Sequence, residues 1–188
     1  MLQQQTELKT KVLQLLDEHQ FMTVATLRSG GWPQATMVGY VHDDLTLYFA
    51  AALVSQKLSN IARDGRVSIA LGHSEPMRLR GLSMAAHAEP VTLSLEIEAV
   101  NELLRERYRG RVAFSPRETA SVLVRAEPKV ISIIDVGKGP GEPELISVSD
   151  DGEVRRIAIK DRASGAERQV TIRTVRPPGE VYRPGAPP

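Results

Sequence analysis

The sequence predicts a mainly β protein of the α+β class, an antiparallel barrel of about six to seven strands with flanking helices. Two observations lead to this prediction. Residues 21–72 contain several short runs that alternate apolar and polar side chains and are rich in β-branched or aromatic residues, as half-buried strands are. Residues 2–19 and 95–109 instead carry apolar side chains at the spacing of amphipathic helices. At 188 residues the chain is long enough to bury a core of its own.

The first three strands are expected at residues 21–28, 33–42 and 45–51. Both connections between them have the composition of tight turns. Residues 29–31, Ser-Gly-Gly, tolerate a positive φ, and Asp43-Asp44 is a polar break between two apolar runs. Strands joined by such short connections pair antiparallel, so this segment predicts a three-stranded meander.

A short helix is predicted directly after the third strand. Ser55 is a suitable N-cap, because its hydroxyl can accept a hydrogen bond from a free N–H of the first turn. Leu58 and Ile61 follow at helical spacing, and Gly65 is well placed to end the helix. A fourth strand is expected immediately beyond it, at residues 66–71.

The middle of the chain predicts one further strand and one further helix. An extended run at residues 77–91 contains Gly81 near its middle, which indicates a bulge or the close approach of another backbone. Ser94 can cap the helix predicted over residues 95–109. Residues 115–118 have the pattern of a capping box, so a short helical turn is expected there.

The last part of the main domain, predicted as residues 1–141, holds two more strands. They are expected at residues 121–125 and 130–136, and residues 126–129, Ala-Glu-Pro-Lys, are read as a turn between them. These two strands bring the total to about seven. The barrel is therefore predicted to be closed or nearly closed.

Residues 142–188 have a different composition and are predicted to be a C-terminal extension. Their alternation is weak, and it predicts a hairpin of residues 153–160 against 168–175. Residues 177–188 are rich in proline and glycine and have no apolar period to bury, so a flexible tail is expected there.

Composition and charge exclude several classes of function. The net charge is +1, which gives no electrostatic reason to expect nucleic acid or an anionic membrane surface as a partner. The chain has no cysteine, which excludes disulfides, thiolate catalysis and cysteine-held metal sites. No apolar run approaches the ~20 residues of a membrane span, and no signal peptide is visible, so a cytoplasmic protein is expected.

Motifs for catalysis or metal binding are scarce. The four histidines, at positions 19, 42, 73 and 87, stand singly and without the spacing of a metal site, so no metal is expected. Neither a glycine-rich dinucleotide fingerprint nor a P-loop is present. No nucleophile–base pair can be identified, and the catalytic residues remain unknown.

The start of the helix after the third strand is the best candidate for a binding site. Ser55, Gln56 and Lys57 place a hydroxyl, an amide and an ammonium group beside the free N–H groups of a helix N-terminus, which suits a phosphate dianion. On physical grounds alone, a solvated surface lysine remains the more common interpretation of such a position.

Several short runs appear in a characteristic order along the chain. They are Ala25-Thr26, Gly30-Gly31-Trp32-Pro33, Leu47-Tyr48-Phe49-Ala50, Ser55-Gln56-Lys57-Leu58-Ser59-Asn60-Ile61, Val67-Ser68-Ile69-Ala70-Leu71, Arg78-Leu79-Arg80-Gly81 with Ala88-Glu89-Pro90-Val91, and the run from Pro128 to Gly139. Their order and spacing resemble the pyridoxamine 5'-phosphate oxidase-like family of FMN-binding split barrels. The resemblance covers about residues 5–141.

The resemblance implies a homodimer that binds FMN at its interface and transfers hydride or electrons to a small-molecule substrate. It implies that Lys57, with Ser55 and Gln56, contacts the phosphate, and that Arg78 assists from a neighbouring strand. The residues implied to line the ring and ribityl chain are Met37, Val38, Gly39, Phe49, Ala50 and Ala51. A homodimer would also explain apolar residues on both alternation classes of the strands, such as Val38 with Met37 and Leu47 with Tyr48.

The chain also departs from the family's namesake enzymes. Their second strand carries further basic residues, whereas residues 33–40 here have none, and their C-terminal arginine–histidine pair is missing. A role in vitamin B6 synthesis is therefore not expected. Two alternatives stay open, namely the same barrel binding a deazaflavin or haem, and a ligand-binding dimer without catalytic activity.

Overall fold

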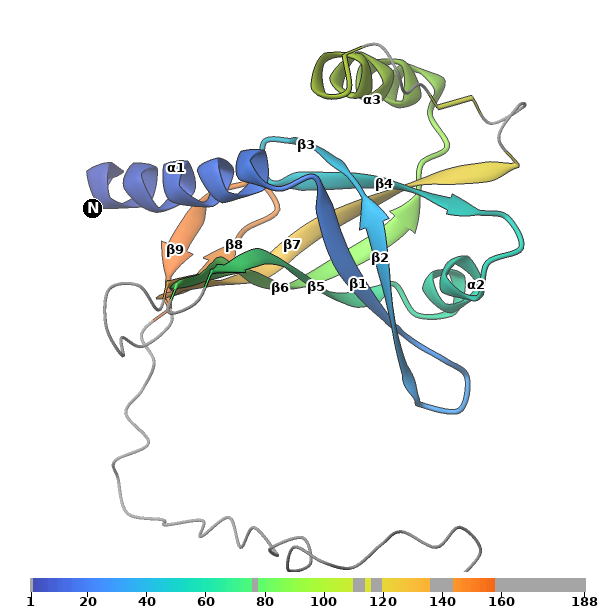
Figure 1. The fold of residues 1–188 in the computed structure, drawn as a ribbon, viewed down its shortest axis with the longest axis horizontal. Coiled ribbons are helices and arrows are strands. Elements are labelled where there is room, and N and C mark those ends of the chain that lie inside the picture. Colours follow the sequence, from blue (N-terminus) through green and yellow to red (C-terminus); the bar gives the residue numbers. More distant parts are fainter. Residues whose placement is uncertain (1, 76–77, 110–113, 116–119, 136–143, 158–188) are drawn as a thin grey trace, which may run out of the picture. The chain divides into compact units, whose positions relative to one another are not determined.

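The structure is a computed structural model that describes residues 2–75, 78–109, 114–115, 120–135 and 144–157 (Figure 1). Its helices are α1 (Leu2–Glu18), α2 (Gln56–Arg63) and α3 (Ser94–Arg107). Its strands are β1 (Phe21–Leu27), β2 (Pro33–Gly39), β3 (Val41–Asp43), β4 (Thr46–Ala52), β5 (Arg66–Glu75), β6 (Arg78–Pro90), β7 (Ser121–Asp135), β8 (Glu144–Val148) and β9 (Val154–Arg156).

All nine strands belong to one sheet, and every pairing in it is antiparallel. The main path runs β2-β1-β5-β6-β7-β4-β3, and β8 and β9 extend it from β7. The two strands at the ends of this path, β2 and β3, are separated along the chain by Tyr40 alone. The barrel is therefore closed at this point by the covalent chain at Tyr40 and not by hydrogen bonds between β2 and β3. The mainly antiparallel split barrel predicted from the sequence is confirmed.

One face of α1 packs into the barrel core, as its apolar stripe predicted. Leu8, Val12, Leu15 and Leu16 are buried and belong to the same cluster as the inward-facing residues of the strands. Buried side chains alternate along β1, where Met22, Val24 and Thr26 face the interior. None of the helices in the described residues is both long and apolar enough to cross a membrane.

A second, smaller cluster lies between α3 and the outer face of the barrel. Val100 of α3 packs there with Val41, Tyr48 and Leu123, and Phe114 completes the group. The sequence attributed the apolar character of Tyr48 to a dimer interface. The structure covers Tyr48 with α3 of the same chain instead, leaving it 8% exposed.

The single strand predicted over residues 33–42 is divided into β2 and β3 at Tyr40. Tyr40 is 1% exposed, and its hydroxyl donates to the carbonyl of Leu16 at 2.8 Å. The chain turns here so that the large ring enters the core beneath the end of α1. The prediction missed this break because the alternation of side chains continues through it.

The two strands predicted at 121–125 and 130–136 form one 15-residue strand, β7, and the turn predicted between them is wrong. Pro128 lies within β7, opposite a register shift between Ala85 and Ala86 of β6. On the other edge, β7 pairs with β4 as far as Ala126 and with β8 from Val130. Because Pro128 falls between these two ladders, its missing N–H interrupts neither of them.

Residues 144–157, which the sequence placed in an extension, add two strands to the barrel sheet. β8 pairs with β7, β9 pairs with β8, and both Ile146 and Val154 are buried in the main core. The connection turns at Gly152, whose φ is +77°. The predicted hairpin partner, residues 168–175, and the predicted tail lie outside the described residues, as do residues 116–118 of the predicted capping box.

The helix predicted after the third strand is confirmed as α2, but Gly65 has a different role from the predicted one. The helix ends at Arg63, and Asp64 follows in an extended conformation. A Cβ on Gly65 would lie 2.7 Å from the carbonyl oxygen of Ala88. Gly65 is therefore required for the close approach of the chain to β6 rather than as a helix terminator.

Candidate functional site at the split of the barrel

The barrel opens between β2 and β4. Val41 of β3 pairs with Tyr48 of β4, and the same register continued into β2 would place Gly39 opposite Ala50. No such pairing occurs within the described residues, because β2 hydrogen-bonds to β1 alone. The facing edges of β2 and of the second half of β4 therefore leave backbone N–H and C=O groups without strand partners. We call the region between these two edges the split.

The N-terminus of α2 lies at one end of the split, directly after β4. Ser55 is the N-cap, and its hydroxyl accepts a hydrogen bond from the N–H of Leu58 at 3.3 Å. The N–H groups of Gln56 and Lys57 precede the first residue that can find an acceptor within the helix. Two donors and the positive end of a helix are thus directed toward this end of the split.

Lys57 is largely buried, at 8% exposure, which is unusual for a lysine. Its ammonium nitrogen lies 5.9 Å from the ring centre of Phe49, and burial lowers the pKa of its side chain. Among the lysines in the described part of the chain, it is the one without a carboxylate partner. A buried cation normally has an anionic partner, and none of the described residues supplies one to Lys57.

A buried polar network holds α2 against the barrel. Asn60 is completely buried, and its amide nitrogen donates to Thr26 of β1 at 2.9 Å and to Gln34 of β2 at 3.3 Å. Its carbonyl oxygen accepts from Gln56 at 3.0 Å. This network fixes the first turn of α2, and Lys57 with it, relative to the edge of β2.

No binding or structural role was predicted for Asn60, Thr26 or Gln34 from the sequence. The available signal was the position of Asn60, four residues after Gln56 and next to the apolar Ile61 on the helix. A polar residue on the buried face of an amphipathic helix needs a partner. The partners themselves lie 26 and 34 residues away in the chain, and only the fold brings them together.

The residues predicted to line a cofactor ring separate into two groups. Three of them are exposed and face out of the barrel on the two edges of the split: Met37, Gly39 and Ala50. The other three face inward and belong to or pack against the main core: Val38, Phe49 and Ala51. Met37 and Ala50 can therefore contact a bound molecule through their side chains and Gly39 through its backbone, whereas Val38 and Ala51 face the core and can contribute backbone groups only. Phe49 belongs to the core cluster and also lines the pocket described below.

Arg78 is not brought close to Lys57 within the chain. It is the first residue of β6 and pairs with Glu75 of β5. The other end of β6 lies next to α2, because the N–H of Ala88 donates to the carbonyl of Gly65, just beyond that helix. Ten residues of extended strand separate Arg78 from Ala88, a distance of about 33 Å.

An apolar pocket of about 240 Å³ lies at the other end of the split, between the barrel and α3. It is lined by Phe21, Gly39, Tyr40, Val41, Tyr48, Phe49, Ala50, Leu104, Tyr108 and Leu123. The Tyr48 hydroxyl donates to Glu96 at 3.2 Å, and burial, with Glu96 beside it, raises the pKa of Tyr48 to about 12. Gly39, Phe49 and Ala50 thus belong both to the predicted ring-binding set and to this pocket.

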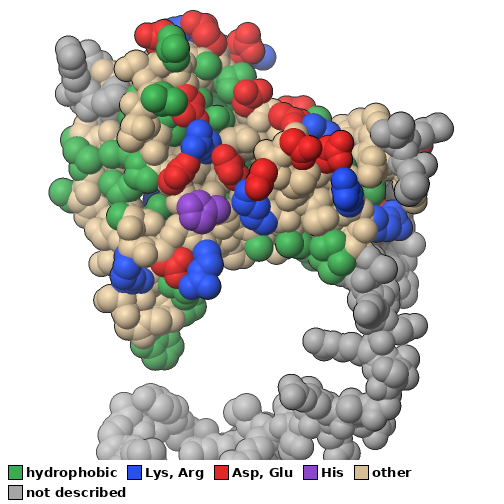
Figure 2. Space-filling model, turned by 180° about the vertical axis from the view of Figure 1, so that it is seen from behind, with side chains coloured by type: hydrophobic (Ala, Val, Ile, Leu, Met, Phe, Trp, Pro, Cys, Tyr) green, Lys and Arg blue, Asp and Glu red, His purple; other side chains and the backbone are tan. Residues whose placement is uncertain are grey.

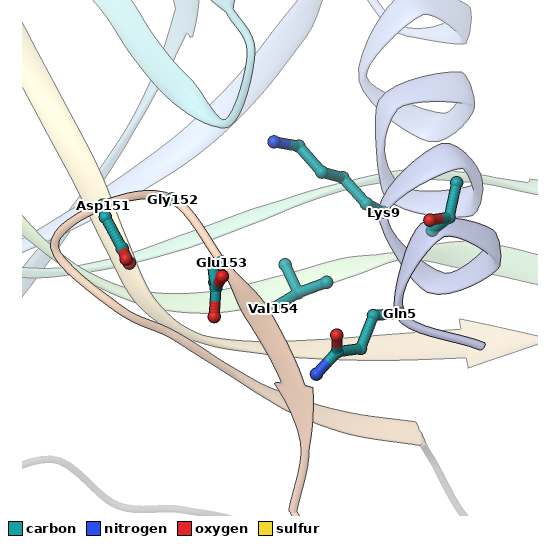
Figure 3. Close-up of a pocket in the computed structure, with 7 residues that line it drawn as sticks. Gln5, Lys9, Asp151, Gly152, Glu153 and Val154 are labelled. Carbon is teal, nitrogen blue, oxygen red and sulfur yellow. The ribbon is translucent and has the colours of Figure 1, made fainter. Parts of the chain in front are cut away.

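A second, more polar pocket of about 220 Å³ lies between the first turns of α1 and the β8–β9 turn (Figure 3). Gln5 and Lys9 reach it from α1, and Asp151 and Glu153 from the turn (Figure 3). Lys9 is already paired with Asp44 at 2.6 Å. The charges in this pocket are therefore largely satisfied within the chain.

Paired charges are also the rule on the surface. Figure 2 shows acidic and basic side chains intermixed on the rear face rather than gathered by sign. Arg125, for example, pairs with Glu96 at 2.9 Å, and Lys129 pairs with Asp150 at 2.8 Å. The lack of a carboxylate partner at Lys57 stands out against this background.

Comparison with known proteins places this fold among characterised families. Residues 8–135 match the family model described as pyridoxamine 5'-phosphate oxidase. General stress protein 26 of Bacillus subtilis (strain 168) is 33% identical over 69 residues, which cover 37% of this chain and 49% of that protein. The match therefore spans about half the length of that relative.

Solved structures extend the similarity over most of the chain. General Stress Protein 26 from Bacillus anthracis superposes with a TM-score of 0.56 and 19% identity, covering 80% of this chain and 99% of the other. A heme-binding protein from Mycobacterium smegmatis gives a TM-score of 0.61 and 19% identity, covering 74% and 57% of the two chains. At these identities the structures establish a shared fold. With the sequence match over residues 8–135, they show that the chain belongs to the family of pyridoxamine 5'-phosphate oxidase-like proteins.

Proposed function

We propose that the protein is an FMN-dependent oxidoreductase that holds the flavin along the split, with the phosphate at the N-terminus of α2. The observation that carries the proposal is the buried Lys57 without a carboxylate partner. Its ammonium group and the N–H groups of Gln56 and Lys57 suit a phosphate dianion. The bound flavin would supply the hydride and electron transfer.

The dimensions of the split support this arrangement. Gln34 of β2 lies beside α2 through its hydrogen bond to Asn60, and Gly39 ends the same strand next to the apolar pocket. Five residues of extended strand span about 17 Å. That length suits an extended ribityl phosphate chain with its ring system toward Gly39 and Ala50. The unpaired backbone groups of β2 would then provide donors and acceptors for the polar edge of the ring.

A homodimer is part of the proposal. The paired strands β1 and β2 present an outward face of apolar side chains that includes Phe21, 59% exposed, Leu27, 37% exposed, and Met37, 71% exposed. Large exposed apolar side chains gathered on one face are typical of interaction sites. A second copy of the chain would cover it and enclose the adjacent split, and light scattering that finds a monomer at micromolar concentration would contradict this.

Haem is the second candidate, since the fold is shared with a heme-binding protein from Mycobacterium smegmatis. Haem iron requires an axial ligand, most often histidine. Of the described histidine side chains, His42 contacts Asp17 at 3.1 Å, His19 contacts the Leu15 carbonyl at 2.7 Å, and His87 is exposed on β6. None of these three histidine side chains lies at the split, so none is placed to be the axial ligand of a haem bound there. This observation favours FMN over haem.

The absorbance spectrum of the purified protein distinguishes these candidates. We expect the yellow colour and absorbance bands of a flavin, either as isolated or after FMN is added and excess removed, with flavin fluorescence on release. A Soret band would instead identify haem. A protein that retains neither chromophore, even at saturating FMN, would overturn the proposed function.

A further inference from the structure

We propose that the apolar pocket beneath α3 binds an uncharged, flat aromatic ring, which forms the ring-bearing end of the substrate. The assignment of this ligand as substrate rests on the proposed function, because the pocket opens beside the residues proposed to hold the flavin ring. The binding of the ring rests on the pocket itself. Its size, lining and rigidity each support the assignment.

The size and lining fit one or two fused rings. A dry cavity of about 150 Å³ is sufficient to bind benzene, and this pocket measures about 240 Å³. Five of its ten lining residues are Phe or Tyr, and the rest are aliphatic or glycine. Faces and edges of aromatic side chains favour another aromatic ring over an aliphatic chain.

The pocket offers no charge and few free polar atoms. No lysine, arginine, histidine or carboxylate is among its lining residues. The hydroxyl groups of its tyrosines donate elsewhere: Tyr108 to the Tyr40 carbonyl at 3.1 Å, Tyr40 to the Leu16 carbonyl and Tyr48 to Glu96. A charged ligand would lose its hydration here without a partner, so the pocket selects an uncharged ring.

The wall formed by α3 is fixed in place by contacts outside the pocket. Arg107 donates to the Leu16 carbonyl at the end of α1 at 2.9 Å and lies 5.3 Å from the ring centre of Tyr40. Asn101 forms two hydrogen bonds with the backbone of Phe114, at 2.9 and 2.6 Å. Because the wall is held without a ligand, little ordering is needed on binding.

Two small residues form the side of the pocket that faces the split. Gly39 is the last residue of β2, and Ala50 is exposed on β4. A Cβ added to Gly39 would lie 3.5 Å from the Tyr108 hydroxyl oxygen and 3.9 Å from Cε1 of Phe21, which are ordinary contacts. The nearest backbone atom, the Gln20 carbonyl oxygen, would lie 3.9 Å away, so a Cβ at position 39 meets no backbone clash. A larger side chain at either position would extend into the pocket that both residues line.

The test is a titration of the full-length protein with 2-naphthol, an uncharged two-ring probe, and with 2-naphthoate, its charged counterpart. Each titration is done on the wild type with and without saturating FMN. The variants are Gly39→Val, which fills the pocket from β2, and Ala50→Leu, which fills it from β4. Ala85→Leu, an exposed alanine on β6, is the matched control.

We expect 2-naphthol to bind the wild type with and without FMN, and 2-naphthoate to bind at least about tenfold more weakly. Gly39→Val and Ala50→Leu should each weaken 2-naphthol at least about tenfold, while Ala85→Leu changes it less than about twofold. Circular dichroism establishes which variants are folded, and either folded variant suffices for the comparison.

The inference is overturned if 2-naphthol does not bind, if 2-naphthoate binds equally well, or if a folded pocket variant binds like the wild type. Displacement of 2-naphthol by FMN would also overturn it, because the pocket would then hold the flavin ring itself. If 2-naphthol binds as expected and FMN does not bind at all, the ring site stands and the proposed flavin function fails.

Discussion

Two helices of the barrel place their lysines in opposite situations. On α1, Lys9 pairs with Asp44 at 2.6 Å and Lys11 pairs with Glu144 at 2.5 Å, and both remain partly exposed. On α2, Lys57 is 8% exposed and has no carboxylate partner among the described residues. The α1 side of the molecule satisfies its charges within the chain, whereas the α2 side keeps one cation unsatisfied. The difference is the basis of the proposal that α2 binds an anion, whereas α1 stabilises the fold.

The same contrast applies to the strands. On the α1 side, β7 continues through Pro128 and joins β8 to the sheet, so the edge is paired. On the α2 side, β2 separates from β4 although the register of β3 and β4 would bring Gly39 beside Ala50. Unpaired edges are a liability unless something covers them. The split is therefore the strand edge that stays unpaired next to α2 within the described residues.

The largest effect is expected from the core beneath α1. Leu15→Ala removes a completely buried side chain from the main cluster and should lower the free energy of unfolding by about 2–5 kcal/mol. Urea denaturation of the wild type and variant measures this change. If α1 serves stability alone, FMN affinity below the unfolding transition should stay unchanged. If Leu15→Ala were as stable as the wild type but no longer bound FMN, α1 would serve binding and not stability, which would contradict this account.

The opposite change is expected at α2. Lys57→Met removes a buried cation and keeps an apolar side chain of similar length, so the free energy of unfolding without ligand should rise by about 1–3 kcal/mol at neutral pH. The same urea experiment measures it. A loss of stability in Lys57→Met would show that the ammonium group contributes favourably to the fold.

The pH dependence of this gain has a definite sign. Burial lowers the pKa of Lys57 in the folded protein, whereas the unfolded chain keeps the ordinary value of about 10.4. Between these two pKa values the unfolded chain binds more protons, so the wild type becomes more stable as pH rises. The advantage of Lys57→Met should therefore be full at neutral pH and shrink through the alkaline range. A gap that does not change with pH would exclude this origin.

The smallest effect is expected from the paired lysines of α1. Lys11→Met breaks a partly exposed ion pair with Glu144, which also binds Arg156. Such pairs contribute about 0.2–1 kcal/mol, so the free energy of unfolding should fall by no more than that. If Lys11→Met lowered the free energy of unfolding as much as Leu15→Ala, the ion pairs of α1 would contribute as much to stability as its buried side chains. That result would contradict the proposed difference between the two helices.

Most features that depend on local pattern were predicted well, but the predicted Ser94 cap is wrong, because α3 begins at Ser94 itself and its N-cap, Leu93, makes no side-chain cap hydrogen bond. The apolar stripe of α1 and the Ser55 cap of α2 are both readable from a few neighbouring residues. The failures at Pro128 and Tyr40 required knowledge of distant parts of the chain. Pro128 looked like a turn residue because the gap between the ladders of β4 and β8 cannot be seen in the sequence. Tyr40 looked like a strand residue because its partner, the Leu16 carbonyl, is distant in the chain.

The candidate site was predictable to a similar extent. Lys57 follows from its position after a strand and from the family resemblance, but its burial and missing partner come from the fold. The Asn60 network and the pocket beneath α3 could not be predicted, since each joins segments that only tertiary structure brings together. Arg78 was assigned by analogy, and the length of β6 places it far from α2 in the same chain.

The central claim is that Lys57 binds the phosphate of the cofactor, and paired titrations of FMN and riboflavin test it most directly. Wild type and Lys57→Met are compared, with Lys129→Met as the control, since Lys129 is an exposed lysine paired with Asp150. A lost charge-assisted hydrogen bond amounts to about 1.5–3 kcal/mol, so FMN should bind Lys57→Met roughly ten- to a hundredfold more weakly. Riboflavin, which lacks the phosphate, should bind all three proteins alike. A loss of less than about threefold for FMN, or an equal loss for riboflavin, would contradict the claim.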